Sequence, residues 1–235
     1  MPQSEHLSKQ YDQDLDDIRS RVLEMGGLVE SQIQMALDAY ASGNAELVDR
    51  IIEEDKRVNR FEVGIDDACI HIVARRQPAA VDLRTVMAIG KIVTDLERMG
   101  DEAEKIARMT RQLYESNQMP PPKFVDVRHV ANVALSMLHR ALDAFARSDA
   151  AEAARVVKED AAIDAEFLAI LRQLITFMME EPRTIGRAIG VVWIAKAVER
   201  IGDHAKNIAE QVIYIVKGAD VRHTDMANVE RQALG

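Results

Sequence analysis

Acidic residues spaced four positions apart are the side chains in this sequence with the clearest chemical potential. Glu97 and Asp101 have this spacing, and Asp55 is followed at the same spacing by the amide Asn59. Residues four apart share one face of a helix, and oxygen ligands of this kind suit hard or borderline cations such as Mg²⁺, Mn²⁺ or iron. If the two helices that carry them pack antiparallel, the four side chains form one candidate metal site.

The same arrangement occurs a second time further along the chain. The candidate ligands are Asp55, Asn59, Glu97 and Asp101 at the first site, and Asp160, Asp164, Glu199 and Asp203 at the second. Asn59 offers a neutral amide where the second site has a carboxylate, so the charge count predicts tighter metal binding at the second site. Glu62 and Asp66 are further side chains that could complete the first site.

The residues alone leave three interpretations of these pairs open. Acidic pairs on an amphipathic helix are commonly a solvated edge, which would make the chain a metal-free helical scaffold. A ferritin-like carboxylate metalloenzyme requires Glu-x-x-His steps, but Gly100 and Gly202 stand where those histidines would be. The third interpretation is a metal-binding protein without catalysis. No nucleophile constellation is present, and the single Cys69 has no base beside it, so we predict no enzyme activity.

The two sets of paired residues are part of a longer internal repeat in the sequence. Segment 36–41 returns as 141–146 and segment 54–55 returns as 159–160, both 105 residues later, whereas 97–101 returns as 199–203, 102 residues later. The three lost residues fall near Pro78, in a stretch that a loop can shorten. We therefore predict an all-α fold of two tandem three-helix bundles related by internal duplication, with up-down helices similar to those of spectrin repeats.

Helix boundaries follow from periodicity and from turn residues. Apolar residues recur at three- and four-residue steps, as on one face of a helix. Gly43-Asn44 and Ser148-Asp149 are residue types that end one helix and cap the start of the next. The proline run 120–122 cannot be helical throughout and separates the two units. The predicted helices span 5–42, 44–76, 82–116, 125–147, 149–179 and 184–217. The predicted bundles span 1–118 and 123–217, and 218–235 is expected to be a polar C-terminal tail that frays.

Composition limits the classes of partner. The formal net charge of −9 opposes binding to nucleic acid and to anionic lipid. One cysteine in 235 residues fits a reducing compartment. The polar N-terminus is unlike a signal peptide, and no apolar run approaches the length of about 20 residues that crosses a bilayer. We expect a cytoplasmic protein that works by binding.

The sequence resembles the PhoU family of phosphate-signalling proteins over about residues 10–217. The resemblance rests on Met25-Gly26-Gly27-Leu28-Val29-Glu30, Ala74-Arg75-Arg76-Gln77-Pro78, Asp82-Leu83-Arg84 and the two Glu-Arg-x-Gly-Asp blocks at 97–101 and 199–203. It implies two three-helix bundles, and multinuclear metal clusters on the paired acidic motifs, with the eight residues named above as ligands. The metal that it implies is Mn, Mg, Fe or Zn.

The same resemblance implies a regulatory role. It implies that the chain is a negative regulator of the phosphate-starvation response, which couples a phosphate ABC transporter, through its ATPase subunit, to a phosphate-sensing histidine kinase. It further implies a homodimer, held at the inner face of the membrane through these partners. These expectations come from the family and not from the spacing of any residues.

Overall fold

A computed structural model describes the backbone of residues 2–115 and 127–234. The helices are α1 (Pro2–Ser42), α2 (Ala45–Arg76), α3 (Ala80–Glu115), α4 (Val127–Arg147), α5 (Ala150–Glu180), α6 (Ile185–Lys217) and α7 (Met226–Leu234), with one 3₁₀ turn at Pro182–Thr184. The described residues contain no strand. The all-α fold is therefore confirmed, and the six predicted helices lie within a few residues of their expected boundaries.

The turns between helices use the residues that the sequence indicated. Asn44 Oδ1 accepts a hydrogen bond of 2.9 Å from the backbone N–H of Glu46, and Asp149 Oδ1 accepts one of 2.9 Å from that of Glu152. Gly43 has a φ of 69°, the left-handed conformation that ends a helix at low cost in glycine. The predicted proline linker at 120–122 lies outside the described residues.

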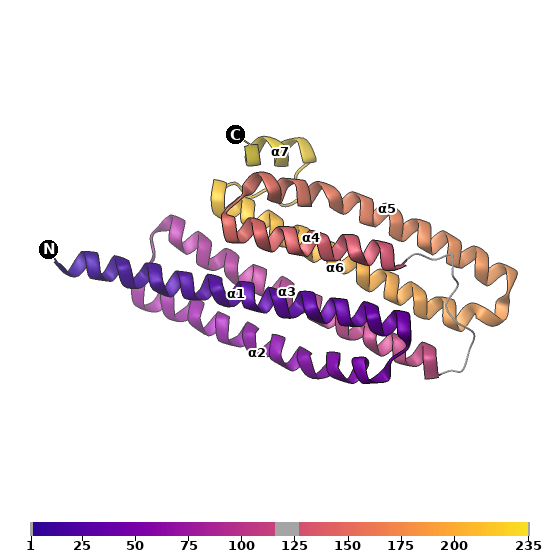
Figure 1. Ribbon diagram of the computed structural model, residues 1–235. Coiled ribbons are helices and arrows are strands. Elements are labelled where there is room, and N and C mark those ends of the chain that lie inside the picture. The colour runs from indigo at the N-terminus through magenta and orange to yellow at the C-terminus, as the bar shows by residue number, and fades with distance from the viewer. Residues whose placement is uncertain (1, 116–126, 235) are drawn as a thin grey trace.

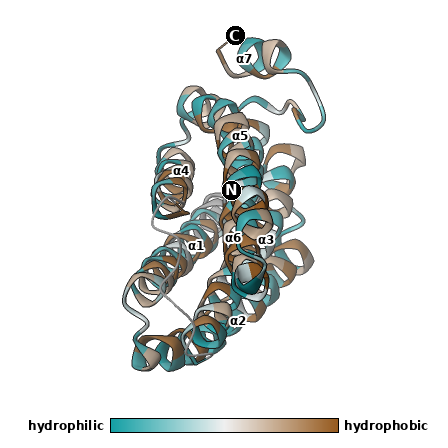
Figure 2. Cartoon of the chain, turned by 90° about the vertical axis from the view of Figure 1, so that its right-hand side faces the viewer, coloured by the Kyte–Doolittle hydropathy of each residue, from teal (hydrophilic) through white to brown (hydrophobic). Residues whose placement is uncertain are grey.

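The two halves of the chain form hairpins that point in opposite directions (Figure 1). The α2–α3 connection lies at one end of the molecule and the α5–α6 connection at the other, while α3 and α6 pack against each other between them. Each helix carries both hydrophilic and hydrophobic residues (Figure 2). One hydrophobic cluster includes Met25 and Ile92 from the first bundle and Met137 and Ile194 from the second. The two bundles thus share a core.

The end of the chain differs from the prediction. Instead of fraying, 226–234 forms α7, which packs on α5 (Figure 1). Val229 and Ala233 are buried, and Lys158 Nζ lies 2.9 Å from Glu230 Oε1. The expectation of a frayed tail was wrong because its polar composition hid two apolar residues four apart, which a short helix presents on one face.

Among the described residues, no helix is both long enough and apolar enough to cross a bilayer.

Candidate metal centre

The first predicted set of ligands lies where α2 faces α3. Asp55 on α2 is buried, and its Oδ1 is 3.3 Å from the place a Cβ would occupy at Gly100 on α3. Gly100 stands between Glu97 and Asp101, so the missing side chain lets Asp55 approach the helix that carries both carboxylates. The structure thus brings the two predicted pairs together across the α2–α3 contact.

A glutamine from α1 joins this group. Gln32 is fully buried, and its Nε2 donates a hydrogen bond of 3.3 Å to Asp55 Oδ1, while Asn59 Nδ2 donates one of 3.1 Å to Asp55 Oδ2. Sequence reasoning missed Gln32 because the prediction considered acidic pairs only, and Gln32 is a neutral residue on a third helix. The available signal was a polar residue within the apolar stripe that includes Val29 and Ile33.

Burial and mutual repulsion raise the pKa values of the carboxyl groups in this cluster. Burial raises the pKa of Glu97, and the charges of Asp101, Glu62 and Asp55 raise it further. The pKa of Asp101 is raised by burial and then by the charge of Asp55. Both effects disfavour the charged carboxylates. We define the first cluster as Asp55, Asn59, Glu97 and Asp101, with Gln32, Glu62 and Asp66 at its edge.

The second predicted set meets in the same way between α5 and α6. Asp160 and Glu199 are buried. Burial raises the pKa of Asp203, and the charges of Glu199, Asp160 and Asp164 raise it further. A Cβ added at Gly202 would lie 2.7 Å from a side chain of α5, so glycine again permits the close approach. These four acidic residues form the second cluster.

Two lysines distinguish the second cluster from the first. Lys206 Nζ lies 2.6 Å from Asp160 Oδ2, and Lys196 Nζ lies 2.6 Å from Glu199 Oε2. At the offset of 102 residues, the counterparts of Lys206 and Lys196 are Glu104 and Thr94. Among the described residues, no lysine or arginine forms an ion pair with Asp55, Glu97 or Asp101, and Arg108 pairs with Glu104 instead. The second cluster is therefore partly neutralised by its own chain.

The oxygen atoms of both clusters are suitable ligands for a hard cation, although their side chains are not arranged around a common point. No group of three or more His, Cys, Asp or Glu side chains in the described part of the chain is arranged to hold a metal ion. Buried oxygens nevertheless lack hydrogen-bond partners in both clusters, namely Gln32 Oε1, Asn59 Oδ1 and Asp160 Oδ1. Carboxylate and amide oxygens are the ligands that such ions take. Metal binding at either cluster would require these side chains to reorient.

Comparisons with known proteins show which family this chain is similar to. A sequence model of the PhoU domain matches residues 22–110 and again residues 127–212, one match in each bundle. The phosphate-specific transport system accessory protein PhoU homolog of Pseudomonas aeruginosa is 46% identical, over 97% of this chain and 93% of that protein. The phosphate-specific transport system accessory protein PhoU of Escherichia coli is 43% identical, over 99% of this chain and 95% of that protein.

Solved structures have the same fold. The crystal structure of PhoU from Pseudomonas aeruginosa superposes with a TM-score of 0.86 at 47% identity, covering 89% of this chain and all of that one. The phosphate transport system regulatory protein PhoU from Streptococcus pneumoniae superposes with a TM-score of 0.82 at 30% identity, covering 90% of this chain and 99% of that one. The similarity therefore extends over both bundles.

Proposed function

This chain belongs to the PhoU family, and we propose that it holds the phosphate-starvation response off when phosphate is plentiful. It does so by coupling the ATPase subunit of a phosphate ABC transporter to a phosphate-sensing histidine kinase, at the inner face of the membrane. The observation that carries this proposal is near full-length similarity to accessory proteins of phosphate-specific transport systems. A regulatory role in phosphate transport is the part of the proposal that these relatives support directly.

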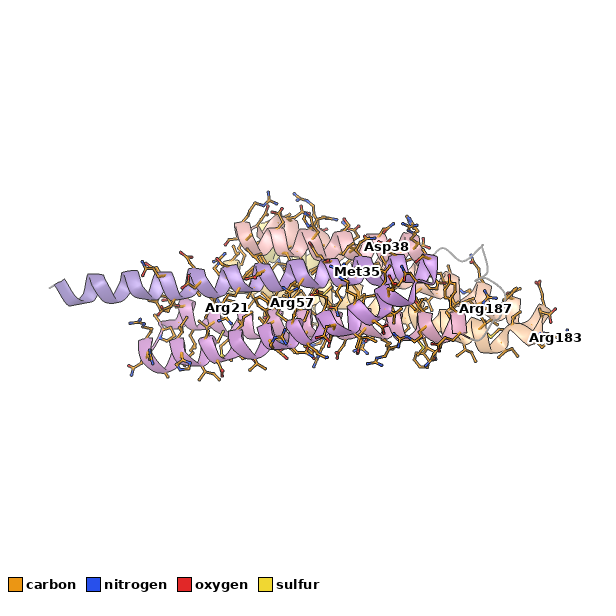
Figure 3. All side chains as sticks on the ribbon, turned by 60° about the horizontal axis from the view of Figure 1, so that its bottom comes forward. Arg21, Met35, Asp38, Arg57, Arg183 and Arg187 are labelled. Atoms are coloured by element: carbon orange, nitrogen blue, oxygen red, sulfur yellow. The ribbon has the colours of Figure 1, made fainter. Side chains whose placement is uncertain are left out.

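Exposed apolar side chains near the α5–α6 turn and on the adjoining part of α6 support a protein partner. They are Ile175, Met179, Ile185, Ile189 and Trp193, of which Met179 is 78% exposed and Trp193 50% exposed. Arg183 lies at the same end of the molecule (Figure 3). Large apolar and aromatic side chains grouped on a surface are typical of protein contacts. We assign this surface to the transporter ATPase.

The two carboxylate clusters supply the metal-binding part of the proposal. Burial, and then repulsion between neighbouring carboxylates, raises the pKa values of Glu97 and Asp101, and manganese, magnesium, iron or zinc bound there would stabilise their charged forms. Counting carboxylates alone favoured the second cluster, but Lys196 and Lys206 reverse that order because they already neutralise two of its four ligands. We therefore propose that the first cluster binds metal more tightly.

Co-purification from cells tests the partner assignment. The tagged chain is isolated from cells grown in phosphate-rich medium, and the bound proteins are identified by mass spectrometry. We expect the transporter ATPase and the sensor kinase, with less ATPase on Trp193→Ala and an unchanged amount on Leu234→Ala, which truncates an exposed apolar residue on α7. Recovery of neither partner by the unchanged chain would contradict the proposal. Light scattering on the purified chain tests the predicted homodimer.

A further inference from the structure

A cleft of about 820 Å³ opens where α2, α3 and the last turns of α6 meet. Its apolar lining comes from Ile70 and Val73 on α2 and from Val86 and Met87 on α3. Clefts that bind small molecules commonly have about 300–1,000 Å³ and an apolar lining with few polar groups. The cleft borders the first carboxylate cluster through Asp66, but its main walls lie nearer to the α2–α3 turn.

The internal duplication places different residues at the positions of the second half that correspond to this cleft. At the offset of 102 residues, Gly90, Lys91 and Gln211 of the cleft correspond to Val192, Trp193 and Met109, which are larger or more apolar. Lys105 Nζ lies 5.7 Å from the centre of the Trp193 ring, and the counterpart of Lys105 is Asn207, another residue of the cleft. Trp193 and Lys105 are thus close to each other at the positions that correspond to Lys91 and Asn207 of the cleft.

A buried amide lines the cleft without a complete set of partners. Gln211 on α6 is 3% exposed, and its Oε1 has no hydrogen-bond partner in the described part of the chain. A buried polar atom of this kind costs free energy unless something donates to it. Its neighbours Asp95 and Asn207 are already joined, since Asn207 Nδ2 lies 3.1 Å from Asp95 Oδ1. Because Gln211 lines the cleft, a reorientation of its side chain would bring this amide oxygen to a ligand that carries a donor.

Basic side chains stand at the mouth of the cleft. Lys91 and Arg98 are exposed, and neither lies within ion-pair distance of a carboxylate in the described part of the chain, while Lys91 Nζ lies 6.0 Å from the centre of the Tyr214 ring. Arg222, from the segment between α6 and α7, also lines the cleft, although it is paired with Asp220. Lys91 and Arg98 are seven positions apart on α3 and so face the same side. An anionic group at the mouth would meet both.

We propose that this cleft binds a small organic anion, with an apolar body between α2 and α3, a hydrogen-bond donor towards Gln211, and its charge at Lys91 and Arg98. Such a site goes beyond the proposed function, because it adds the binding of a small molecule to a protein proposed to act through metal and protein partners. Asp95 of the cleft also contacts His204, with Oδ1 2.8 Å from Nδ1, so the ligand would sit against a polar contact between the two bundles.

Two fluorescent probes that differ by one charge test the proposal on the full chain. Anilinonaphthalene sulfonate has an apolar aromatic body, one N–H donor and one anionic group, whereas phenylnaphthylamine has the same body and donor without the charge. We expect one-to-one binding of the sulfonate. Lys91→Gln is expected to weaken binding of the sulfonate about threefold and to leave binding of the neutral probe unchanged, because only the sulfonate meets the Lys91 charge.

Filling the cleft is the sharper test. A Cβ added at Gly90 would meet only Asp66 Oδ1, at 3.9 Å, so Gly90→Val is compatible with the fold and copies Val192. We expect it to weaken sulfonate binding by roughly tenfold or more. The control is Gly186→Val, another helical glycine with no atom within 4 Å of an added Cβ. Unchanged affinity in Gly90→Val, or equal effects of Lys91→Gln on both probes, would overturn the proposal.

Discussion

Lys206 Nζ lies 2.6 Å from Asp160 Oδ2, whereas the first half of the chain has Glu104 at the position of that lysine. A cation at one position and an anion at the other give two otherwise similar carboxylate clusters different net charges. The attraction of a site for a cation grows with its negative charge. We therefore expect the proposed metal affinities of the two clusters to differ, with the first cluster binding more tightly.

Replacing the second cluster's lysine with its first-half counterpart tests this difference. Lys206→Glu removes the ion pair with Asp160 and adds a negative charge, so Mn²⁺ affinity at the second cluster is expected to rise about tenfold. Titration calorimetry measures the change. The control is Lys158→Glu, which reverses an exposed lysine on α5 that pairs with Glu230. Equal affinities in the two variants would contradict the role given to Lys206.

Removing one carboxylate from the first cluster is expected to have opposite effects with and without metal. Glu97 and Asp101 repel each other as a like-charged pair four apart, so Asp101→Asn relieves a strain of about 0.3 kcal/mol in protein treated with chelator. The same change removes a ligand, so stabilisation by added Mn²⁺ should shrink. Thermal unfolding with chelator and with Mn²⁺ measures both effects. A lower melting temperature in chelator would argue against repulsion in this cluster.

The stability of the metal-free protein should depend on pH through the same groups. A carboxyl whose pKa is raised in the folded state, as at Asp55, Glu97 and Asp101, binds its proton more tightly there than in the unfolded chain. These groups therefore add stability as the pH falls from neutrality through their raised values, and that stability is lost as the pH rises again. Urea unfolding in chelator at several pH values measures the slope. Glu97→Gln should flatten it, and an unaltered slope would count against this origin.

Gly100 is expected to be essential to the first cluster's geometry. A Cβ there would lie 3.2 Å from Gln32 Oε1 and 3.3 Å from Asp55 Oδ1, so Gly100→Ala should destabilise the protein by about 1–2 kcal/mol and weaken metal binding. Gly27→Ala is the control, because nothing lies within 4 Å of its added Cβ and alanine favours a helix by about 0.5–1 kcal/mol. If both changes stabilise the protein, the α2–α3 approach does not depend on Gly100.

The sequence allowed prediction of the features that depend on local pattern. The caps at Asn44 and Asp149 follow from residue type alone, and the repeated Glu97 and Glu199 motifs revealed the duplication. Each of these signals is a short block of sequence that can be recognised without knowing how the helices pack. The helices, their turns and the pairing of acidic residues across α2–α3 and α5–α6 were accessible for that reason.

Features that depend on the rotation of packed helices were not accessible. Gln32 reaches Asp55 from a third helix, and Lys206 reaches Asp160 across the α5–α6 contact, at a sequence separation of 46 residues. The sequence contains both residue types, but it does not show which face each helix presents to its neighbours. The burial of Val229 in α7 was missed for a related reason, since one turn of apolar spacing is too short to stand out in a polar segment.

The central claim, that this chain holds the phosphate-starvation response off, is tested most directly by reporter expression in a deletion strain. Alkaline phosphatase activity is measured in phosphate-rich medium with the gene present, deleted, and restored. We expect high activity in the deletion strain and a return to low activity when the chain is restored. Low activity in all three strains, in medium where starvation of the parent still induces the enzyme, would contradict it.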